Sequence, residues 1–148
     1  MLAADFLHLA KDVRTVNENA DFFHLDIMDG VFVPNISFGF PVLKYVKQLC
    51  TKPLDVHLMI DRPHRYIEQF AKAGADIITI HLESCNDPMK VLQYIRSKEV
   101  RCALAISPAT PVEKIIPFGS HHVFMAKILC ANAKEELIDQ NGRLRMDK

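Results

Sequence analysis

One repeated pattern constrains the fold of this chain more than any other feature. A short apolar run is followed by a polar break, an amphipathic stretch and a Gly or Pro stop, which is typical of a β-strand followed by a helix. The apolar runs lie at residues 21–28, 53–59, 76–81 and 100–106. Comparable points on them are 31, 23 and 24 residues apart, at Asp26, His57, Ile80 and Leu104. This spacing suits successive βα units of a parallel sheet, so we predict a single α/β domain.

The amphipathic stretches place the helices. We expect helices near residues 41–50, 63–73 and 88–97, a further one upstream around residues 7–16, and a short one that begins near Thr110. At the ends of the chain the pattern is weaker. There we expect the end of a strand at residues 1–4, a sixth strand at 122–125 and a helix at 131–140.

Length and charge exclude several classes of protein. The 148 residues, 49% of them apolar, suffice for one domain with a core but not for a complete (β/α)₈ barrel, which needs at least about 200 residues. With 18 basic and 18 acidic residues the chain offers no net field to hold nucleic acid or an anionic membrane. It also contains no apolar stretch of membrane-spanning length and no signal-peptide pattern at its start. We therefore expect a soluble, cytoplasmic protein.

The cysteines suggest neither disulfides nor a thiolate metal site. They are scattered with no C-x-x-C pair, so we expect buried free thiols at Cys50, Cys85, Cys102 and Cys130. Cys85 has no histidine at an activating spacing, and we interpret it as structural. The chain also lacks a G-x-G-x-x-G or Walker loop, so nothing indicates nucleotide binding.

Polar residues near the carboxyl ends of the predicted strands suggest a metal site. His24 and Asp26 are two residues apart on one strand and share a face, His57 occupies the matching place on the next strand, and His81 with Glu83 follows on the third. Two imidazoles and a carboxylate suit Zn²⁺, Fe²⁺ or Mn²⁺. Any one of these histidines alone would be expected simply to bond a backbone carbonyl, but three in register favour the metal site.

Three nearby residues have an ordinary structural reading. Met28 and Met59 follow the metal candidates directly and are either core filler or groups that keep a charged site dry. Asp29, followed by Gly30, is by default only turn chemistry.

Several stretches together resemble one known family. Residues 24–35 (HLDIMDGVFVPN) and 37–39 (SFG) resemble the signature of the ribulose-phosphate 3-epimerase family. Further matches follow in order at 2–6 (LAADF), 53–59 (PLDVHLM), 74–76 (GAD), 81–83 (HLE), 104–108 (LAISP) and 110–111 (TP). The likeness covers residues 1 to about 117, and residues 118–148 diverge.

The resemblance implies a (β/α)₈ barrel that interconverts D-ribulose 5-phosphate and D-xylulose 5-phosphate, in the pentose phosphate pathway, using one divalent metal ion. By position, His24, Asp26 and His57 match three of the family's four metal ligands, and Asp26 also matches one of its two acid/base groups. Met28 and Met59 match methionines that line the substrate site, with His57 beside them. The expected partner is thus a small sugar phosphate.

The chain also departs from the family pattern. No segment matches the V-D-G-G that supplies the fourth ligand and second acid/base, or the N-P-G-F-G-G-Q phosphate loop, and Ala3 stands where many members have serine. We therefore expect one incomplete barrel domain over residues 1–148, with about five to six of the eight strands, and no turnover by this chain alone.

Alternatives to an active epimerase remain open. The same motifs fit allulose-6-phosphate 3-epimerase, and a non-catalytic remnant could still bind metal or self-associate. The orotidine-phosphate decarboxylase group is disfavoured because its aspartate-lysine motif is absent. We expect a homo-oligomer, because runs such as 21–28 and 76–81 look apolar on both faces and a partial barrel would leave sheet edges open.

Overall fold

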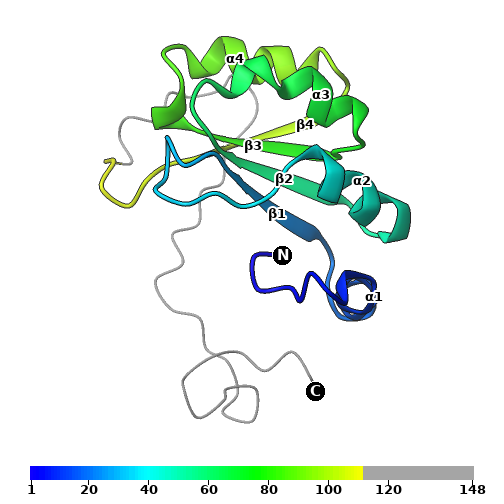
Figure 1. Cartoon of the computed structure of the whole chain (residues 1–148). Helices are drawn as coiled ribbons and strands as arrows, with labels where there is room; N and C mark the ends of the chain where they lie inside the picture. The colour runs from blue at the N-terminus through cyan, green and yellow to red at the C-terminus, as the bar shows by residue number, and fades with distance from the viewer. Residues whose placement is uncertain (112–148) are drawn as a thin grey trace.

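The computed structural model describes residues 1–111, which fold around a four-stranded parallel sheet (Figure 1). The strands follow one another in chain order from one edge of the sheet to the other. They are β1 (Phe23–Met28), β2 (Leu54–Met59), β3 (Ile77–His81) and β4 (Arg101–Ala105). The predicted α/β class is confirmed.

Helix α1 (Leu9–Asn19) precedes β1, and the other helices connect successive strands and cover one face of the sheet (Figure 1). These are α2 (Phe40–Leu49), α3 (Ile67–Lys72) and α4 (Pro88–Arg96), with single 3₁₀ turns η1 (Pro63–Arg65) and η2 (Leu82–Ser84). Local chemistry sets several of their ends. Asp87, for example, accepts a hydrogen bond from the Lys90 amide at the start of α4, where Pro88 is the first helical residue.

The core lies between the helices and one face of the sheet. Alternate strand residues point into it, and the residues between them do not, so the burial of β1 and β2 alternates along each strand. The fully buried strand residues include Phe23, Leu25, Leu54, Val56, Leu58, Ile78 and Ile80. The expectation that residues 21–28 are apolar on both faces is wrong, because the second face of β1 presents His24 and Asp26.

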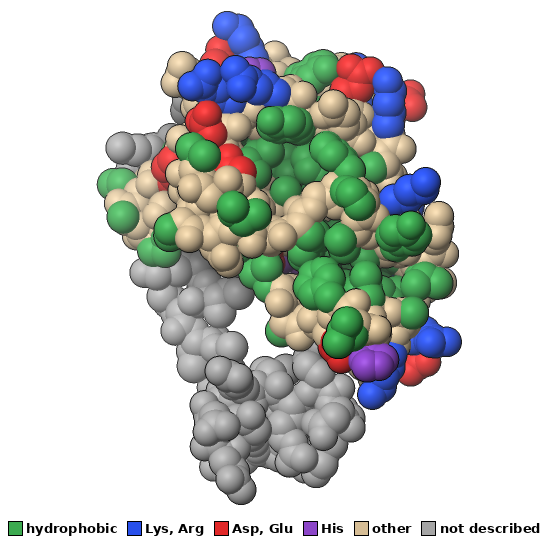
Figure 2. Space-filling model, in the orientation of Figure 1, with side chains coloured by type: hydrophobic (Ala, Val, Ile, Leu, Met, Phe, Trp, Pro, Cys, Tyr) green, Lys and Arg blue, Asp and Glu red, His purple; other side chains and the backbone are tan. Residues whose placement is uncertain are grey.

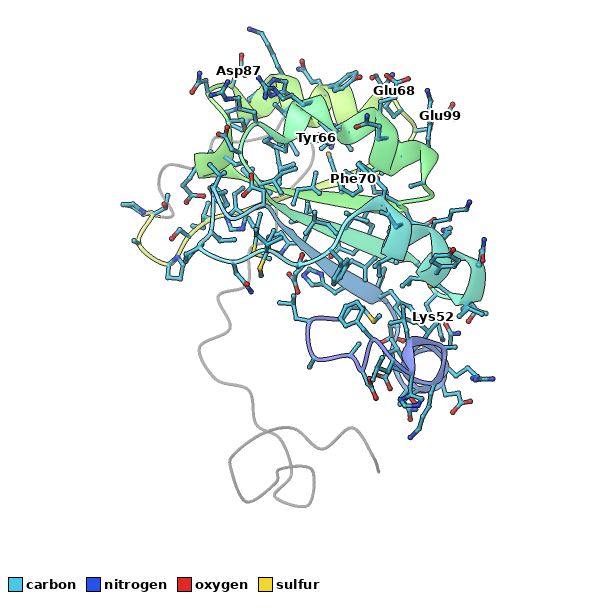
Figure 3. All side chains as sticks on the ribbon, in the orientation of Figure 1. Lys52, Tyr66, Glu68, Phe70, Asp87 and Glu99 are labelled. Atoms are coloured by element: carbon cyan, nitrogen blue, oxygen red, sulfur yellow. The ribbon has the colours of Figure 1, made fainter. Side chains whose placement is uncertain are left out.

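Helix α3 shows how the helices divide core from solvent. Phe70 is 2% exposed and lies on the side of α3 that faces the sheet, whereas Glu68 lies on the outer side, where it pairs with Lys72 (Figure 3). The Phe70 ring meets the ring of Phe40 at a centroid distance of 4.5 Å, which joins α3 to α2.

One glycine and one ion pair fix the junction between α3 and β3. Gly74 has a φ of +97°, a conformation that residues with a Cβ rarely adopt, and the Lys47 side chain lies directly against it. Lys47 then reaches Asp76, whose carboxylate also accepts from the Leu54 amide. These contacts join α2 to the starts of β2 and β3.

The chain ends differ from expectation where the structure describes them. Residues 1–4 form a turn and not a strand, and the Met1 amino group donates to the His24 carbonyl at 3.2 Å. Of the five to six expected strands, residues 1–111 contain four. The expected strand at 122–125 and the helices after Thr110 and at 131–140 lie outside the described residues. None of the helices in residues 1–111 is both long and apolar enough to cross a bilayer.

Candidate functional site

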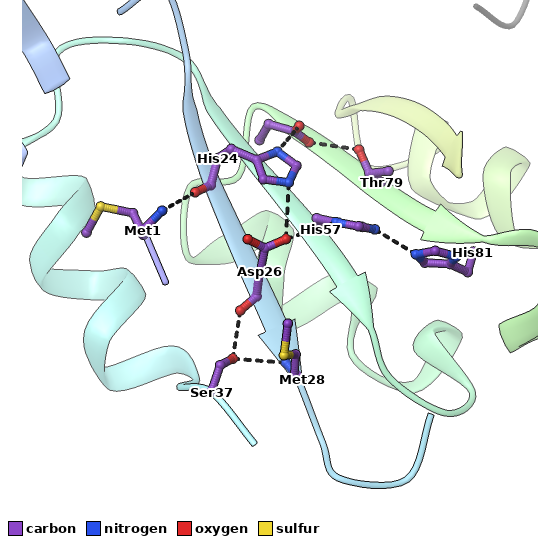
Figure 4. A network of polar contacts seen from close by, with 9 residues as sticks. Met1, His24, Asp26, Met28, Ser37, His57, Thr79 and His81 are labelled. Atoms are coloured by element: carbon purple, nitrogen blue, oxygen red, sulfur yellow. Dashed lines mark hydrogen bonds and ion pairs between the residues drawn. The ribbon is translucent and has the colours of Figure 1, made fainter. Parts of the chain in front are cut away.

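Polar side chains gather on the face of the sheet opposite the helices of residues 1–111. Because strand side chains alternate, His24 and Asp26 on β1 point to this face together. The parallel register places His24 beside Asp55 and Asp26 beside His57. The alternation that buries one set of residues therefore presents the other set as a cluster (Figure 4).

Asp26 is the centre of this cluster. Its Oδ1 atom lies 3.2 Å from His24 Nε2 and 3.1 Å from His57 Nδ1. The side chains of Asp26 and His57 are less than one fifth exposed, whereas that of His24 is about half exposed. Two imidazoles from neighbouring strands thus meet one carboxylate oxygen.

Asp55 supports His24 from the adjacent strand. Its Oδ2 lies 2.8 Å from His24 Nδ1, and its Oδ1 accepts a hydrogen bond from the Thr79 hydroxyl at 2.8 Å. The Asp55 carboxylate accepts from His24 Nδ1 and so orients the ring with Nε2 toward Asp26.

His57 has a second partner on its other ring nitrogen. His57 Nε2 lies 2.8 Å from His81 Nε2, and the two rings are close to parallel. On its far side the His81 ring contacts Phe32, with a centroid distance of 5.0 Å, and its Nδ1 lies 3.4 Å from a Glu83 oxygen.

Backbone contacts fix the end of β1. The Ser37 hydroxyl donates to the Asp26 carbonyl at 2.6 Å and accepts from the Met28 amide at 3.0 Å (Figure 4). Met28 and Met59 are register partners one step beyond Asp26 and His57, and both are half-buried. They lie on the same face as the polar cluster, next to it.

The loop after β1 is organised by Asp29, as the turn chemistry of the sequence predicts. Its carboxylate accepts from the Val31 and Phe32 amides at 2.9 Å and from the Asp61 amide at 2.7 Å. Gly30 follows with a φ of +73°. This loop places Phe32 against His81.

The ionisation of the cluster follows from these contacts. Hydrogen bonds to Asp26 and Asp55 raise the pKa of His24 to about 9. Hydrogen bonds from His24 and His57 hold the pKa of Asp26 well below its usual range. Burial lowers the pKa of His81, and the neighbouring His57 lowers it further, so His81 is neutral at physiological pH. Because its pKa is held so low, Asp26 is ionised at any physiological pH.

The cluster fits a divalent metal ion. One ligand atom each from His24, Asp26 and His57 lie within 4.8 Å of one another, which is the separation that a single ion can bridge. Two imidazole nitrogens and one carboxylate oxygen are the donors that Zn²⁺, Fe²⁺ and Mn²⁺ accept. The Asp55 carboxylate on His24 adds the outer support that metal-bound histidines usually have.

The structure thus brings together the three residues that the sequence pointed to as metal ligands, with Met28 and Met59 beside them. Asp55, Ser37 and Thr79 were missed. Asp55 had a usable signal, because it precedes His57 by two residues just as His24 precedes Asp26, and so shares its face.

The cysteines in the described residues agree with the structural interpretation. Cys50, Cys85 and Cys102 are free thiols, as expected. Each is only half-buried, whereas we expected buried side chains. Cys130 lies outside the described residues. Burial raises the pKa of the Cys85 thiol, which makes it a poor nucleophile.

Comparisons with known proteins give one consistent result. A sequence model described as the ribulose-phosphate 3 epimerase family matches residues 1–127. Ribulose-phosphate 3-epimerase from Bacillus subtilis (strain 168) is 43% identical over 84% of this chain and 55% of its own length. The enzyme of the same name from Helicobacter pylori (strain J99) is 44% identical over 78% of this chain and 52% of its own. The chain spans about half the length of these curated relatives.

Two further matches complete the comparison. A rice relative (Oryza sativa subsp. japonica), named ribulose-phosphate 3-epimerase, cytoplasmic isoform, is 42% identical over 79% of this chain and 52% of its own length. A solved structure of orotidine 5'-monophosphate decarboxylase from Methanocaldococcus jannaschii aligns with a TM-score of 0.47 at 22% identity, covering 69% of this chain and 46% of that one.

Proposed function

Because the chain belongs to the ribulose-phosphate 3 epimerase family, we propose that it serves the interconversion of D-ribulose 5-phosphate and D-xylulose 5-phosphate with one divalent metal ion. In this proposal His24, Asp26 and His57 hold the ion, which is Zn²⁺, Fe²⁺ or Mn²⁺. The observation that carries it is the meeting of these three side chains at one point on the open face of the sheet.

The reaction explains why such a site is needed. Inverting the carbon next to a ketone requires that a proton leave one face of that carbon and that a proton be added to the other face. The intermediate is an enediolate, and a bound cation supplies the positive charge that stabilises its negative oxygens. The protein must therefore hold a base close to the carbon and keep that base ionised.

Asp26 meets both requirements. Its carboxylate is held ionised by His24 and His57, and its neighbouring backbone is fixed by Ser37. We assign to Asp26 the removal and return of the C3 proton on one face of the substrate. Met28 and Met59, half-buried at the end of the two strands, would contact the sugar and exclude water from the reacting carbon.

The proton on the opposite face needs a second group. Among residues 1–111, the neighbouring carboxylates are already engaged: Asp55 by His24 and Thr79, and Glu83 by the Ser107 amide and the Thr110 hydroxyl. We therefore assign neither of them this role. Asp26 alone would support exchange of the C3 proton with solvent, with inversion much slower than exchange.

Deuterium exchange tests the proposal directly. The full chain is loaded with Zn²⁺, Fe²⁺ or Mn²⁺ in turn and incubated with ribulose 5-phosphate in D₂O, and NMR follows deuterium at C3 and the formation of xylulose 5-phosphate. We expect metal-dependent exchange that Asp26→Asn abolishes. The matched control is Asp21→Asn, which removes an exposed carboxylate just before β1. The proposal is wrong if the wild-type chain gives no exchange, or if Asp26→Asn exchanges as fast as wild type.

Two alternatives are resolved by the same experiment. With allulose 6-phosphate as substrate, faster exchange than with ribulose 5-phosphate would assign the chain to that related reaction. Metal binding without exchange of either sugar would identify a metal-binding protein without turnover. We also propose a cytoplasmic location, which is supported by the name of the rice relative.

A further inference from the structure

The contact between His57 and His81 constrains where their protons lie. Their Nε2 atoms are 2.8 Å apart, the distance of a hydrogen bond. Two imidazole nitrogens form such a bond only if one carries a proton and the other offers its lone pair. The tautomer of one ring therefore determines the tautomer of the other.

The surroundings of the other ring nitrogen of His81, Nδ1, bear on where the proton of that ring lies. Its Nδ1 atom is buried and has no hydrogen-bond partner among residues 1–111, although a Glu83 oxygen lies 3.4 Å away. The other oxygen of Glu83 is held by the Ser107 amide and the Thr110 hydroxyl. A carboxylate is thus fixed beside a ring nitrogen with which it does not bond.

With one proton on each ring and no metal ion, the contacts allow one arrangement. His57 donates from Nδ1 to Asp26 and accepts at Nε2 from His81. The proton of neutral His81 is then on Nε2, and its Nδ1 is a lone pair facing the Glu83 carboxylate. Lone pairs do not bond to one another, which explains the unpartnered nitrogen.

If His57 Nδ1 served as a metal ligand, the opposite arrangement would be required. His57 would then carry its proton on Nε2 and donate it to His81, whose own proton would lie on Nδ1, toward Glu83. The protons balance: one leaves His57 Nδ1, one crosses from His81 Nε2 to His57 Nε2, and one is taken up at His81 Nδ1. The number of protons on the two rings is unchanged, and His81 Nδ1 gains an acceptor in Glu83.

We propose that His81 and Glu83 are positioning residues that hold His57 in the tautomer able to bind the metal ion. The inference rests on the proposed metal site and extends it to the His81 ring and the Glu83 carboxylate. Loss of such outer partners typically lowers metal affinity by about 10–100-fold.

A matched pair of substitutions tests the role of His81. His81→Gln keeps an amide oxygen that can accept from His57 Nε2, whereas His81→Leu offers an apolar side chain and no acceptor. We expect calorimetric titration of the full chain with Zn²⁺ to show an affinity about 10–100-fold weaker for His81→Leu and near wild type for His81→Gln. Equal affinities for the wild type and His81→Leu would overturn the inference.

A measurement on the wild-type chain avoids any effect of substitution on folding. Long-range ¹H–¹⁵N correlation NMR distinguishes the protonated from the unprotonated nitrogen of each ring. We expect Zn²⁺ to move the His81 proton from Nε2 to Nδ1. We expect it also to move the His57 proton from Nδ1 to Nε2. If His81 keeps its proton on the same nitrogen with and without Zn²⁺, the inference is wrong.

The titration also separates this inference from the function on which it rests. If the wild-type chain binds no Zn²⁺, or if His57→Ala binds it as tightly as wild type, the metal site itself is refuted, together with the inference. If His57→Ala abolishes binding while His81→Leu and the NMR spectra show no effect, only the inference fails.

Discussion

Asp26 on β1 and His57 on β2 are register partners, and Asp26 Oδ1 lies 3.1 Å from His57 Nδ1. Two residues 31 positions apart in the chain thus form one polar contact because their strands pair in parallel. The contact therefore forms only when β1 and β2 are paired as in the native sheet.

Removal of His57 should abolish metal binding. His57→Ala leaves only His24 and Asp26 as ligands, so we expect its Zn²⁺ affinity to fall by at least about 100-fold in calorimetric titration. His64→Ala is the matched control, because His64 is exposed on η1 and outside the cluster. Equal affinities of His57→Ala and wild type would show that the ion binds elsewhere.

The stability of the metal-free chain should fall as pH rises. The pKa of His24 is about 9 in the fold and about 6.5 in an unfolded chain, so its bonds to Asp26 and Asp55 stabilise the fold fully below about pH 6.5. This contribution is lost as pH rises through about 9. Urea unfolding with a chelator present should show a falling free energy of unfolding across this range. In His24→Gln the fall should be clearly smaller, and an identical fall would exclude His24 as its source.

The affinity for Zn²⁺ should change in the opposite direction over the same range. The proton on His24 Nε2 must leave before that nitrogen can bind an ion, so the apparent affinity should rise with pH up to about 9. Titrations in buffers of different ionisation enthalpy would also detect the released proton. An affinity that does not change with pH would mean that His24 is not a ligand.

Gly74→Ala should destabilise the fold without affecting the site. The φ of +97° is unfavourable for alanine by about 1–2 kcal/mol, and the new Cβ would lie 2.8 Å from Lys47 Cε. Gly39→Ala is the control, since an added Cβ there meets no other atom of residues 1–111 within 4 Å. Chemical unfolding should show a larger loss for Gly74→Ala than for Gly39→Ala, because Gly39, the N-cap residue of α2, has an extended backbone that alanine can adopt. Similar losses for both would contradict the backbone argument.

Self-association is a further prediction. Hydrophobic side chains reach the surface across the middle of the face seen in Figure 2, with charged groups toward its rim. Leu7 is 90% exposed, and Val31 and Ile36 in the loop after β1 are each 74% exposed. With no net charge to oppose association, we expect a dimer or larger assembly. Light scattering at micromolar concentration measures this, and a monomer mass would refute it.

The sequence predicts most of the sheet because the buried positions of strands and helices recur at regular spacings as apolar residues. The strand at 53–59 and the helix at 88–97 were both placed within about a residue of β2 and α4. The helix expected at 63–73 is instead η1 followed by α3, with Tyr66 between them at a φ of −119°. A change from a 3₁₀ turn to an α-helix leaves no clear mark in the pattern of apolar residues.

Contacts within the site were harder to predict than its members. His24, Asp26 and His57 follow from alternation and strand order, both of which are visible in the sequence. The hydrogen bond from His24 to Asp55 requires the register of β1 against β2, which the spacing of the strands does not fix. The turn at residues 1–4 was missed because its polar contact, from Met1 to the His24 carbonyl, depends on a segment far along the chain.

The shared register of β1 and β2 also couples ligand binding to the cooperative unfolding of the sheet. The pairing that buries Leu25 and Val56 is the one that aligns Asp26 with His57, so the unfolded chain has no preformed site. An ion that binds only the native state adds RT ln(1 + [M]/Kd) to the free energy of unfolding, about 2.7 kcal/mol at 100 times Kd. Metal supply would then govern how long the chain survives proteolysis, independently of any turnover.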